Sequence, residues 1–168
     1  MQSYYNRTII LSGGFDPVHV GHVRMFQDAS AKGTNQVIVL LNSDAWLTRK
    51  KGRPFMLYEQ RHEIISAFKG VSLVHPVDDS DGTVVKGLQQ IAAFREWMDL
   101  PPMYFGNGGD RTSETTPSAE QNFCIDNNIG LLFNLGGEKI QSSSELIREW
   151  EEARETADEL LVVLRQAS

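Results

Sequence analysis

The pattern of apolar and polar positions predicts a regular alternation of β-strands and α-helices. Short runs rich in β-branched and other apolar residues alternate with longer stretches whose apolar residues recur every three or four positions. The predicted strands cover residues 8–12, 36–42, 71–75, 103–106 and 130–135, and the predicted helices cover residues 20–32, 58–69, 83–99, 117–128 and 142–165. This alternation is typical of crossover connections in a parallel sheet.

The order of elements predicts a single α/β domain over residues 1–168, with a five-stranded parallel sheet and helices on both faces. Neither an internal repeat nor a linker-like segment divides the sequence. In such folds, ligands bind at the carboxyl edge of the sheet, where the strand order reverses. The loops predicted at that edge are residues 13–19, 43–54, 106–116 and 136–144, and these loops contain most of the residues that suggest chemistry.

The last predicted helix is acidic and carries an apolar stripe. Residues 145–159 hold seven acidic residues and two arginines. The stripe has mostly helical spacing and consists of Leu146, Ile147, Trp150, Ala153, Ala157, Leu160, Leu161 and Leu164. Packing of this face against the core is the simplest interpretation, and a contact with another copy of the chain is the alternative.

Composition narrows the class of protein. The net charge of −6 argues against a general nucleic-acid-binding protein, which usually gathers a basic surplus on one face. No apolar run approaches the ~18 residues of a membrane span, and the first residues do not resemble a signal peptide. Cys124 is the single cysteine and is expected to be a semi-buried thiol in a reducing compartment. These features predict a cytoplasmic protein with neither nucleic-acid nor membrane partners.

Positive charge gathers in one short segment of this acidic chain. Arg49, Lys50, Lys51 and Arg53 place four cations within five positions. Such a cluster is typical of a site that receives a compact anion, although a solvated basic loop has the same sequence.

The loop after the first predicted strand reads GGFDPVHVGH over residues 13–22. The two leading glycines let the backbone approach a ligand closely, and the next helix offers free N–H groups and a positive dipole end to a phosphate. His19 and His22 lie three positions apart, so both imidazoles face one side of a first helical turn and can donate hydrogen bonds. Gly21 removes a side chain where a nucleotide would lie. The segment therefore predicts a phosphate-binding loop.

This segment resembles the signature of the nucleotidyltransferase superfamily that includes cytidylyltransferases, adenylyltransferases of coenzyme synthesis and heptose-phosphate adenylyltransferases. The resemblance extends over nearly the whole chain and implies a Rossmann-like fold. It implies that His19 and His22 contact a triphosphate and stabilise its charge in the transition state. The nucleotide site that it implies here includes Gly13, Gly14, Phe15, Asp16 and Gly21.

Residues 42–61 indicate which members of this superfamily the chain resembles most. The stretches NSDA at 42–45, KGRP at 51–54 and EQR at 59–61 resemble a heptose-phosphate adenylyltransferase domain, and the spacing also suits glycerol-3-phosphate cytidylyltransferase. In the second comparison, Lys50 stands at the position of the family's acceptor-binding lysine.

The next family lysine, which meets the triphosphate, corresponds to Gly52, so Lys51 or Arg53 would have to replace it. The resemblance therefore implies catalytic roles for Lys50 and Lys51. The acceptor-binding residues that it implies are Lys50, Arg53, Arg61 and Lys86. The alternatives are a structural ion pair for Arg61 and a solvated helix position for Lys86.

Two further loops complete the predicted site. Residues 106–111 read GNGGDR and resemble the family's glycine-aspartate motif, which implies that Gly106, Gly109 and Asp110 bind the nucleotide. Residues 111–120 exceed the family's short loop, and a lid, a part of the acceptor pocket and a disordered loop all stay open as interpretations.

Ser142, Ser143 and Ser144 match the family's Ser/Thr cluster that binds nucleotide phosphates. Ser142 and Glu145 also have the spacing of a capping box, which needs no ligand, and both roles can hold together. The arginine that many relatives carry a few residues earlier is missing, and Lys139 is the replacement that this stretch offers.

The implied reaction transfers AMP or CMP from ATP or CTP to a small phosphorylated acceptor, a sugar or polyol phosphate, with release of pyrophosphate. Catalysis of this kind comes from positioning two polyanions and stabilising transition-state charge. No Cys/His cluster in the sequence offers a metal site, so Mg²⁺ is expected to arrive with the NTP. The alternatives are adenylylation of phosphopantetheine or nicotinate mononucleotide, and a non-catalytic nucleotide-binding protein. Because relatives are often oligomers, a homodimer or higher homo-oligomer also stays open.

Overall fold

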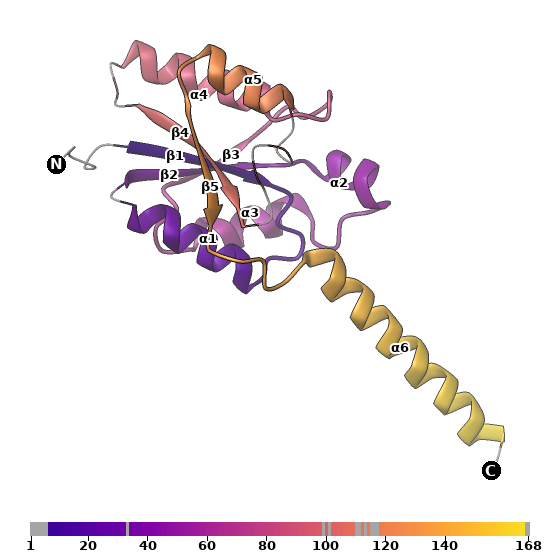
Figure 1. Cartoon of the computed structure of the whole chain (residues 1–168). Helices are drawn as coiled ribbons and strands as arrows, with labels where there is room; N and C mark the ends of the chain where they lie inside the picture. Colours follow the sequence, from indigo (N-terminus) through magenta and orange to yellow (C-terminus); the bar gives the residue numbers. More distant parts are fainter. Residues whose placement is uncertain are drawn as a thin grey trace.

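The computed structural model describes residues 7–32, 34–98, 100, 102–109, 112, 114 and 118–166. A parallel sheet of five strands forms its centre (Figure 1). The strands are β1 (Arg7–Gly13), β2 (Thr34–Leu41), β3 (Leu73–Pro76), β4 (Met103–Gly108) and β5 (Gly130–Leu135). Their spatial order is β3-β2-β1-β4-β5, and every neighbouring pair is parallel. The predicted five-stranded parallel sheet is confirmed, and its strand order reverses between β1 and β4.

Helices cover both faces of the sheet, as predicted (Figure 1). The helices α1 (Val20–Ala31) and α3 (Tyr58–Ser66) lie on one face, and α4 (Val85–Trp97) and α5 (Ser118–Asp126) lie on the other. Alternation of side chains along the strands explains the two layers. Ile9 and Leu11 of β1 pack with α1 and α3, whereas Ile10 between them packs with α4 and α5.

Cys124 lies on α5 in the second of these two apolar layers and is fully buried. Desolvation, with a smaller contribution from the carboxylate of Glu120, raises the pKa of the Cys124 thiol to about 11. A thiol that stays protonated is a poor nucleophile. Cys124 is thus a packing residue and is more deeply buried than the semi-buried thiol that the sequence predicts.

The segment predicted as a loop over residues 43–54 contains a helix, α2 (Asp44–Lys51). Ser43 caps its start, because the Ser43 hydroxyl accepts a hydrogen bond from the N–H of Trp46 at 3.0 Å. Gly52 ends it with a φ of 88° and donates its N–H to the carbonyl of Thr48 at 2.9 Å. Helical spacing places Trp46 and Lys50 one turn apart on a single face.

The last helix, α6 (Ser143–Gln166), begins at the carboxyl edge of the sheet and projects away from the domain (Figure 1). The prediction that its apolar stripe packs into the core is therefore wrong. Trp150, Leu160 and Leu161 are 59%, 59% and 51% exposed. Beyond its first turns, the helix passes none of the other elements in the described part of the chain. None of the helices among the described residues combines the length and apolar character needed to span a membrane.

Candidate active site

A pocket of about 370 Å³ opens at the carboxyl edge of the sheet, next to the reversal of strand order between β1 and β4. Its walls come from segments 12–25, 46–51, 108–109 and 135–144. Each of the four loops predicted at this edge contributes to it. The volume is within the usual range for small-molecule sites.

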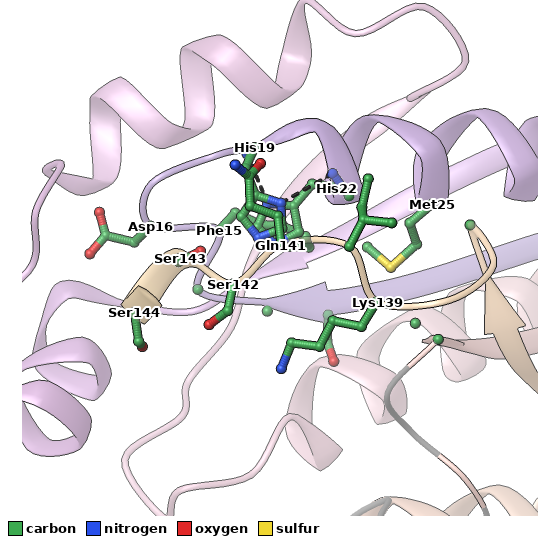
Figure 2. Close-up of a pocket in the computed structure, with 18 of the residues that line it drawn as sticks. Phe15, Asp16, His19, His22, Met25, Lys139, Gln141, Ser142, Ser143 and Ser144 are labelled. Atoms are coloured by element: carbon green, nitrogen blue, oxygen red, sulfur yellow. Dashed lines mark hydrogen bonds between the residues drawn. The ribbon is translucent and has the colours of Figure 1, made fainter. Parts of the chain in front are cut away.

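His19 and His22 stack against each other in this pocket (Figure 2). Their ring centroids are 3.7 Å apart, and their planes differ by 22°. The ring of Phe15 meets His22 edge-on at 4.9 Å and is itself almost fully buried in the core. Phe15 thus lines the pocket and also supports the His22 ring from the core side.

Backbone hydrogen bonds select the proton position on both imidazoles. The Nδ1 atom of His19 accepts from the N–H of Gly21 at 3.1 Å, and the Nδ1 atom of His22 accepts from the N–H of His19 at 3.2 Å. A nitrogen that accepts carries no proton, so each neutral ring carries its hydrogen on Nε2. Burial and the charge of Lys139 lower the pKa of His19, which favours this neutral form. Two Nε2–H donors therefore stand side by side at the pocket.

Gly21 has a local role in addition to the predicted one. A Cβ atom on Gly21 would lie 3.0 Å from Cε1 and 3.1 Å from Nδ1 of His19. The missing side chain thus leaves space for the His19 ring, which folds back over the first turn of α1. Gly21 still lines the pocket.

The N-terminus of α6 forms another part of the pocket wall, through Ser142, Ser143 and Ser144. The hydroxyl of Ser143 donates to the carbonyl of Pro17 at 2.8 Å and so ties α6 to the loop that carries the histidines. Ser142 accepts the N–H of Leu146 at its carbonyl, at 3.0 Å, while its side chain points toward the pocket (Figure 2). The hydrogen bonds of the predicted capping box with Glu145 are not among those formed by the described residues. The first amides of α6 have no helical acceptor, and the residues that carry them line the same cavity.

Three lysines line the pocket: Lys50 and Lys51 from α2, and Lys139 from the loop before α6. The ammonium group of Lys50 lies 4.6 Å from the ring centroid of Trp46. The ammonium group of Lys51 forms an ion pair with the carboxylate of Asp16 at 2.9 Å. The side chain of Lys139 extends along the pocket near the serines (Figure 2). The two sides of the pocket thus each carry positive charge.

Asp16 is predicted to bind the nucleotide, but its carboxylate serves the scaffold. Its side chain is fully buried, and its two oxygens accept from the N–H of Phe55 at 2.8 Å and of Met56 at 2.6 Å. It points away from the histidines (Figure 2). These bonds and the Lys51 ion pair engage the carboxylate, while Asp16 also lines the pocket and its nucleotide contact stays a prediction.

Arg61 is predicted to bind the acceptor, but the structure gives it the alternative role of an ion-pair residue. Its side chain is completely buried, and it pairs with the carboxylate of Asp44 at 2.7 Å. It also donates to the carbonyl oxygens of Gly14 at 2.6 Å, Asn42 at 3.0 Å and Met56 at 3.0 Å. Arg61 therefore fixes the backbone behind the pocket, and no surface of its guanidinium is left to meet an acceptor.

Three more predicted site residues lie away from the pocket. Arg53 follows α2 and is exposed outside the pocket lining. Lys86 is exposed on α4 and pairs with Asp78 at 2.7 Å. Gly106 lies inside β4, where a Cβ atom would come within 2.7 Å of buried leucine side chains, so it is a packing glycine. Asp110, also predicted to bind the nucleotide, lies outside the described residues.

Gly109, which is predicted to bind the nucleotide, lines the pocket and also serves packing. A Cβ atom there would lie 1.7 Å from the carbonyl oxygen of Gly137, so only glycine lets the end of β4 pass this turn. Gly13 and Gly14 line the pocket as well. A Cβ atom on Gly14 would lie 2.7 Å from Leu47, so this glycine lets α2 pack against the loop that carries the histidines.

Several lining residues are not among those predicted from the sequence, including Trp46, Gly108 and Gln141. Trp46 lies in the segment that is predicted as a loop and forms α2. Ser43 as N-cap, three cations in the last turn and Gly52 at the end together form a helix signature that would have found it. The indole N–H of Trp46 donates to the carbonyl of Gly82 at 3.3 Å, which holds the ring at the pocket wall.

The chain matches the family model described as Cytidylyltransferase-like over residues 10–162, and it therefore belongs to this family. This agrees with the resemblance found in the sequence.

Similar curated proteins carry the name Bifunctional protein HldE. That of Geotalea uraniireducens (strain Rf4) is 30% identical over 144 residues, which are 84% of this chain and 27% of the relative. That of Photorhabdus laumondii subsp. laumondii is 30% identical over 128 residues, 75% of this chain and 24% of the relative. That of Sulfurimonas denitrificans is 40% identical over 75 residues, 44% of this chain and 16% of the relative. The chain thus spans about a quarter or less of the length of these relatives.

Solved structures share the fold. A lipopolysaccharide core biosynthesis protein from Thermoplasma volcanium GSS1 superposes with a TM-score of 0.58 at 18% identity, covering 77% of this chain and 94% of that one. A candidate nicotinate-nucleotide adenylyltransferase from Vibrio parahaemolyticus gives a TM-score of 0.56 at 19% identity, with 88% of each chain covered. At these identities the likeness establishes the Rossmann-like fold alone.

Proposed function

We propose that this chain is a nucleotidyltransferase that moves AMP or CMP from ATP or CTP to a sugar or polyol phosphate and releases pyrophosphate. The observation that carries the proposal is the convergence of the His19 and His22 Nε2–H donors with the N-termini of α1 and α6 at one pocket. Donors grouped in this way are typical of sites that stabilise phosphoryl oxygens. Membership in the Cytidylyltransferase-like family supports the same class of reaction.

In the proposed reaction, an oxygen of the acceptor phosphate attacks the α-phosphorus in line. The bond between this phosphorus and the oxygen that bridges the α- and β-phosphorus atoms breaks, and pyrophosphate leaves with the electron pair. The imidazoles of His19 and His22 donate hydrogen bonds to phosphoryl oxygens and keep their protons. Lys139 and the amides that begin α6 add positive potential beside them. The barrier is lowered by position and charge, since phosphoryl transfer asks little covalent work of a protein.

The α2 wall is the proposed acceptor side. Lys50 lines the pocket on this wall, and we assign its ammonium group to the acceptor phosphate. Lys51 forms the ion pair with Asp16. Trp46 lies under the Lys50 ammonium group and offers an apolar surface against which a carbon skeleton can pack. The likeness of residues 51–54 to heptose-phosphate adenylyltransferases supports a sugar or polyol phosphate over phosphopantetheine or nicotinate mononucleotide.

The donor is proposed to enter as the Mg²⁺ complex of the NTP. Within the described residues, His, Cys, Asp and Glu form no group of three or more that could hold a metal ion. Asp16 belongs to the loop that carries the histidines, and its oxygens are already engaged by backbone amides and Lys51. Phosphate oxygens and water are therefore the ligands that suit Mg²⁺ here.

The test is pyrophosphate release by the purified chain with Mg²⁺. ATP, CTP, GTP and UTP are each combined with heptose-1-phosphate, glycerol-3-phosphate, phosphopantetheine and nicotinate mononucleotide. Release with ATP or CTP and a sugar or polyol phosphate, and its loss in His22→Ala, would support the proposal. Release only with a coenzyme precursor would replace the acceptor class. Nucleotide binding without release from any pair would favour a non-catalytic binding protein.

A further inference from the structure

Beyond its first turns, the apolar stripe of α6 packs against no other element in the described part of the chain. From residue 148 to residue 163 the side chains are exposed, including Trp150 at 59% and Leu160 at 59%. Exposed apolar surface of this extent is typical of an interaction site. A helix of 24 residues is roughly 36 Å long, so the stripe extends far beyond the body of the domain.

The stripe has the spacing of a coiled-coil seam. Its positions 146, 150, 153, 157, 160 and 164 are separated alternately by four and three residues. This spacing places the seam residues at a and d positions of a heptad, the pattern by which two helices pack side by side. The occupant expected on such a seam is another helix with the same spacing.

The charge of α6 distinguishes between another helix and a lipid surface as the partner of the stripe. Helices that lie on membranes carry lysine and arginine on their polar face. The polar face of α6 is acidic instead, with seven acidic residues and two arginines between positions 145 and 159. Anionic lipid would repel this face. The heptad spacing instead fits a helix with the same spacing, and a second copy of the chain supplies one.

The order of residue sizes along the seam is self-complementary when the second copy runs in the opposite direction. Trp150 then lies opposite Leu160 of the partner, and Ala153 lies opposite Ala157. Both pairs belong to one register, because facing residues of an antiparallel pair have numbers with a constant sum. Large residues meet large residues and small residues meet small ones. In this register the flanking apolar residues Ile147 and Leu161 also face each other across the pair.

A parallel pair would have a different advantage, since Glu149 would lie near Arg154 of the partner. In the antiparallel pair, Arg154 lies near its own copy, among acidic residues such as Glu151 and Asp158 of the same helix. Exposed ion pairs contribute little, whereas burial of large apolar side chains contributes more. The contact between Ile147 and Leu161 therefore outweighs the ion pair and favours the antiparallel arrangement.

A hollow beside the first turns of α6 supplies a second contact for the partner. It has a volume of about 420 Å³ and is lined only by apolar residues, Pro17, Phe55, Leu146, Ile147 and Trp150. Phe55 is 58% exposed at its edge. The antiparallel register brings Leu160 and Leu161 of the second helix to this hollow, next to the loop that carries the histidines.

We propose that two copies of this chain associate through an antiparallel pairing of their α6 helices, with the end of each helix covering the apolar hollow of the other copy. This inference is independent of the proposed reaction, because it concerns association alone.

Sedimentation velocity of the full chain without nucleotide tests the association. We expect a dimer at ~100 µM and a shift to monomer in Leu160→Asp, which places a charge in the seam. Val162→Asp is the matched control, because Val162 is 53% exposed but faces away from the seam, and this variant stays dimeric. Far-UV circular dichroism checks that both variants fold. A monomeric wild type, or a dimeric Leu160→Asp, overturns the proposal, as does binding of a monomeric chain to phosphatidylglycerol vesicles.

A second pair of variants tests the hollow. Phe55→Asp is expected to raise the dimer dissociation constant at least about tenfold, because it places a charge on the covered surface. Leu57→Asp is the control, since Leu57 is equally exposed, at 57%, and does not line the hollow. Equal effects of the two variants would contradict docking at this place.

Disulfide trapping tests the direction of the helices. In the antiparallel register, Trp150→Cys links to Leu160→Cys only when the two variants are mixed. In a parallel pair each variant would link to itself. The two variants would not link to each other, because residues ten positions apart on a helix are separated by roughly 15 Å, beyond the reach of a disulfide. Self-linked variants without mixed dimers would overturn the antiparallel arrangement. The native Cys124 is fully buried and does not compete.

Discussion

Arg61 donates a hydrogen bond from Nη1 to the carbonyl oxygen of Gly14 at 2.6 Å. Through this contact, a completely buried guanidinium on α3 fixes the backbone of the loop that carries both histidines. Its other donors hold the end of β2 at Asn42 and the start of α2 at Asp44. One side chain thus joins three segments behind the pocket.

We expect Arg61→Met to lower the free energy of unfolding by about 3 kcal/mol or more, because it leaves buried carbonyl groups and the Asp44 carboxylate without their partner. Urea denaturation followed by circular dichroism measures the change. Arg53→Met is the control, since Arg53 is exposed and should change stability little. An Arg61 variant as stable as the wild type would show that the buried guanidinium does not support the loop.

His22→Ala is expected to reduce kcat/KM by roughly a hundredfold or more, since loss of one donor to a developing charge typically costs about 3 kcal/mol. Pyrophosphate release under saturating acceptor provides the measurement. Lys86→Ala, on an exposed residue outside the pocket, should retain the wild-type rate. An unchanged rate in His22→Ala would remove this imidazole from the reaction.

The basic segment allows a comparison of two nearby cations. Lys50 lines the pocket and Arg53 does not. We expect Lys50→Ala to raise the KM for the acceptor at least about tenfold, because a charge-assisted hydrogen bond is worth roughly 1.5–3 kcal/mol. Arg53→Ala should leave this KM close to the wild-type value. Initial rates at fixed NTP and varied acceptor distinguish the two, and equal effects would instead indicate a diffuse attraction by the whole segment.

The histidine pair should give the protein a defined response to acid. Burial and the charge of Lys139 lower the pKa of His19 below its ordinary value of 6.5. Because the folded pKa is the lower one, the stabilisation of the neutral ring is fully present above pH 6.5 and is lost as the pH falls through the lowered folded pKa. We therefore expect the His19 titration, followed by NMR, to have its midpoint below 6.5.

Lys139→Met should move that midpoint upward, because it removes the positive charge that opposes protonation of His19. Lys139→Arg retains the charge and is the matched control. A midpoint that does not respond to Lys139→Met would leave burial as the sole cause of the shift.

The local elements and the histidine loop could be predicted from the sequence. The segment GGFDPVHVGH is a strand end, a glycine turn and a helix start in ten consecutive residues, so neighbours in the chain are neighbours in space. The order of strands and helices also fixed the parallel sheet, because crossover connections leave few other arrangements. The same rule predicted that the four loops meet at one edge, and they do.

Only the tertiary structure decided which polar and glycine residues face the pocket. Asp16 and Arg61 look like ligand-binding residues in the sequence. In the structure, their side chains form hydrogen bonds with backbone groups from segments far along the chain. Gly106 follows the family's motif, yet the register of β4 between β1 and β5 places it against leucine side chains. Such roles depend on contacts between distant segments, which spacing along the chain does not encode.

The last helix, α6, combines a local property with one that depends on the tertiary structure. Its apolar spacing is a local property and was readable in the sequence, because helical periodicity repeats every three to four residues. Whether that stripe enters the core depends on the direction in which the helix leaves the sheet. The connection from β5 to α6 contains a turn at Gly136 and Gly137, both with positive φ. After this connection, α6 runs outward from the domain (Figure 1). Sequence alone therefore determined the helix and its apolar face, and the tertiary path of the chain decided that this face stays outside the core.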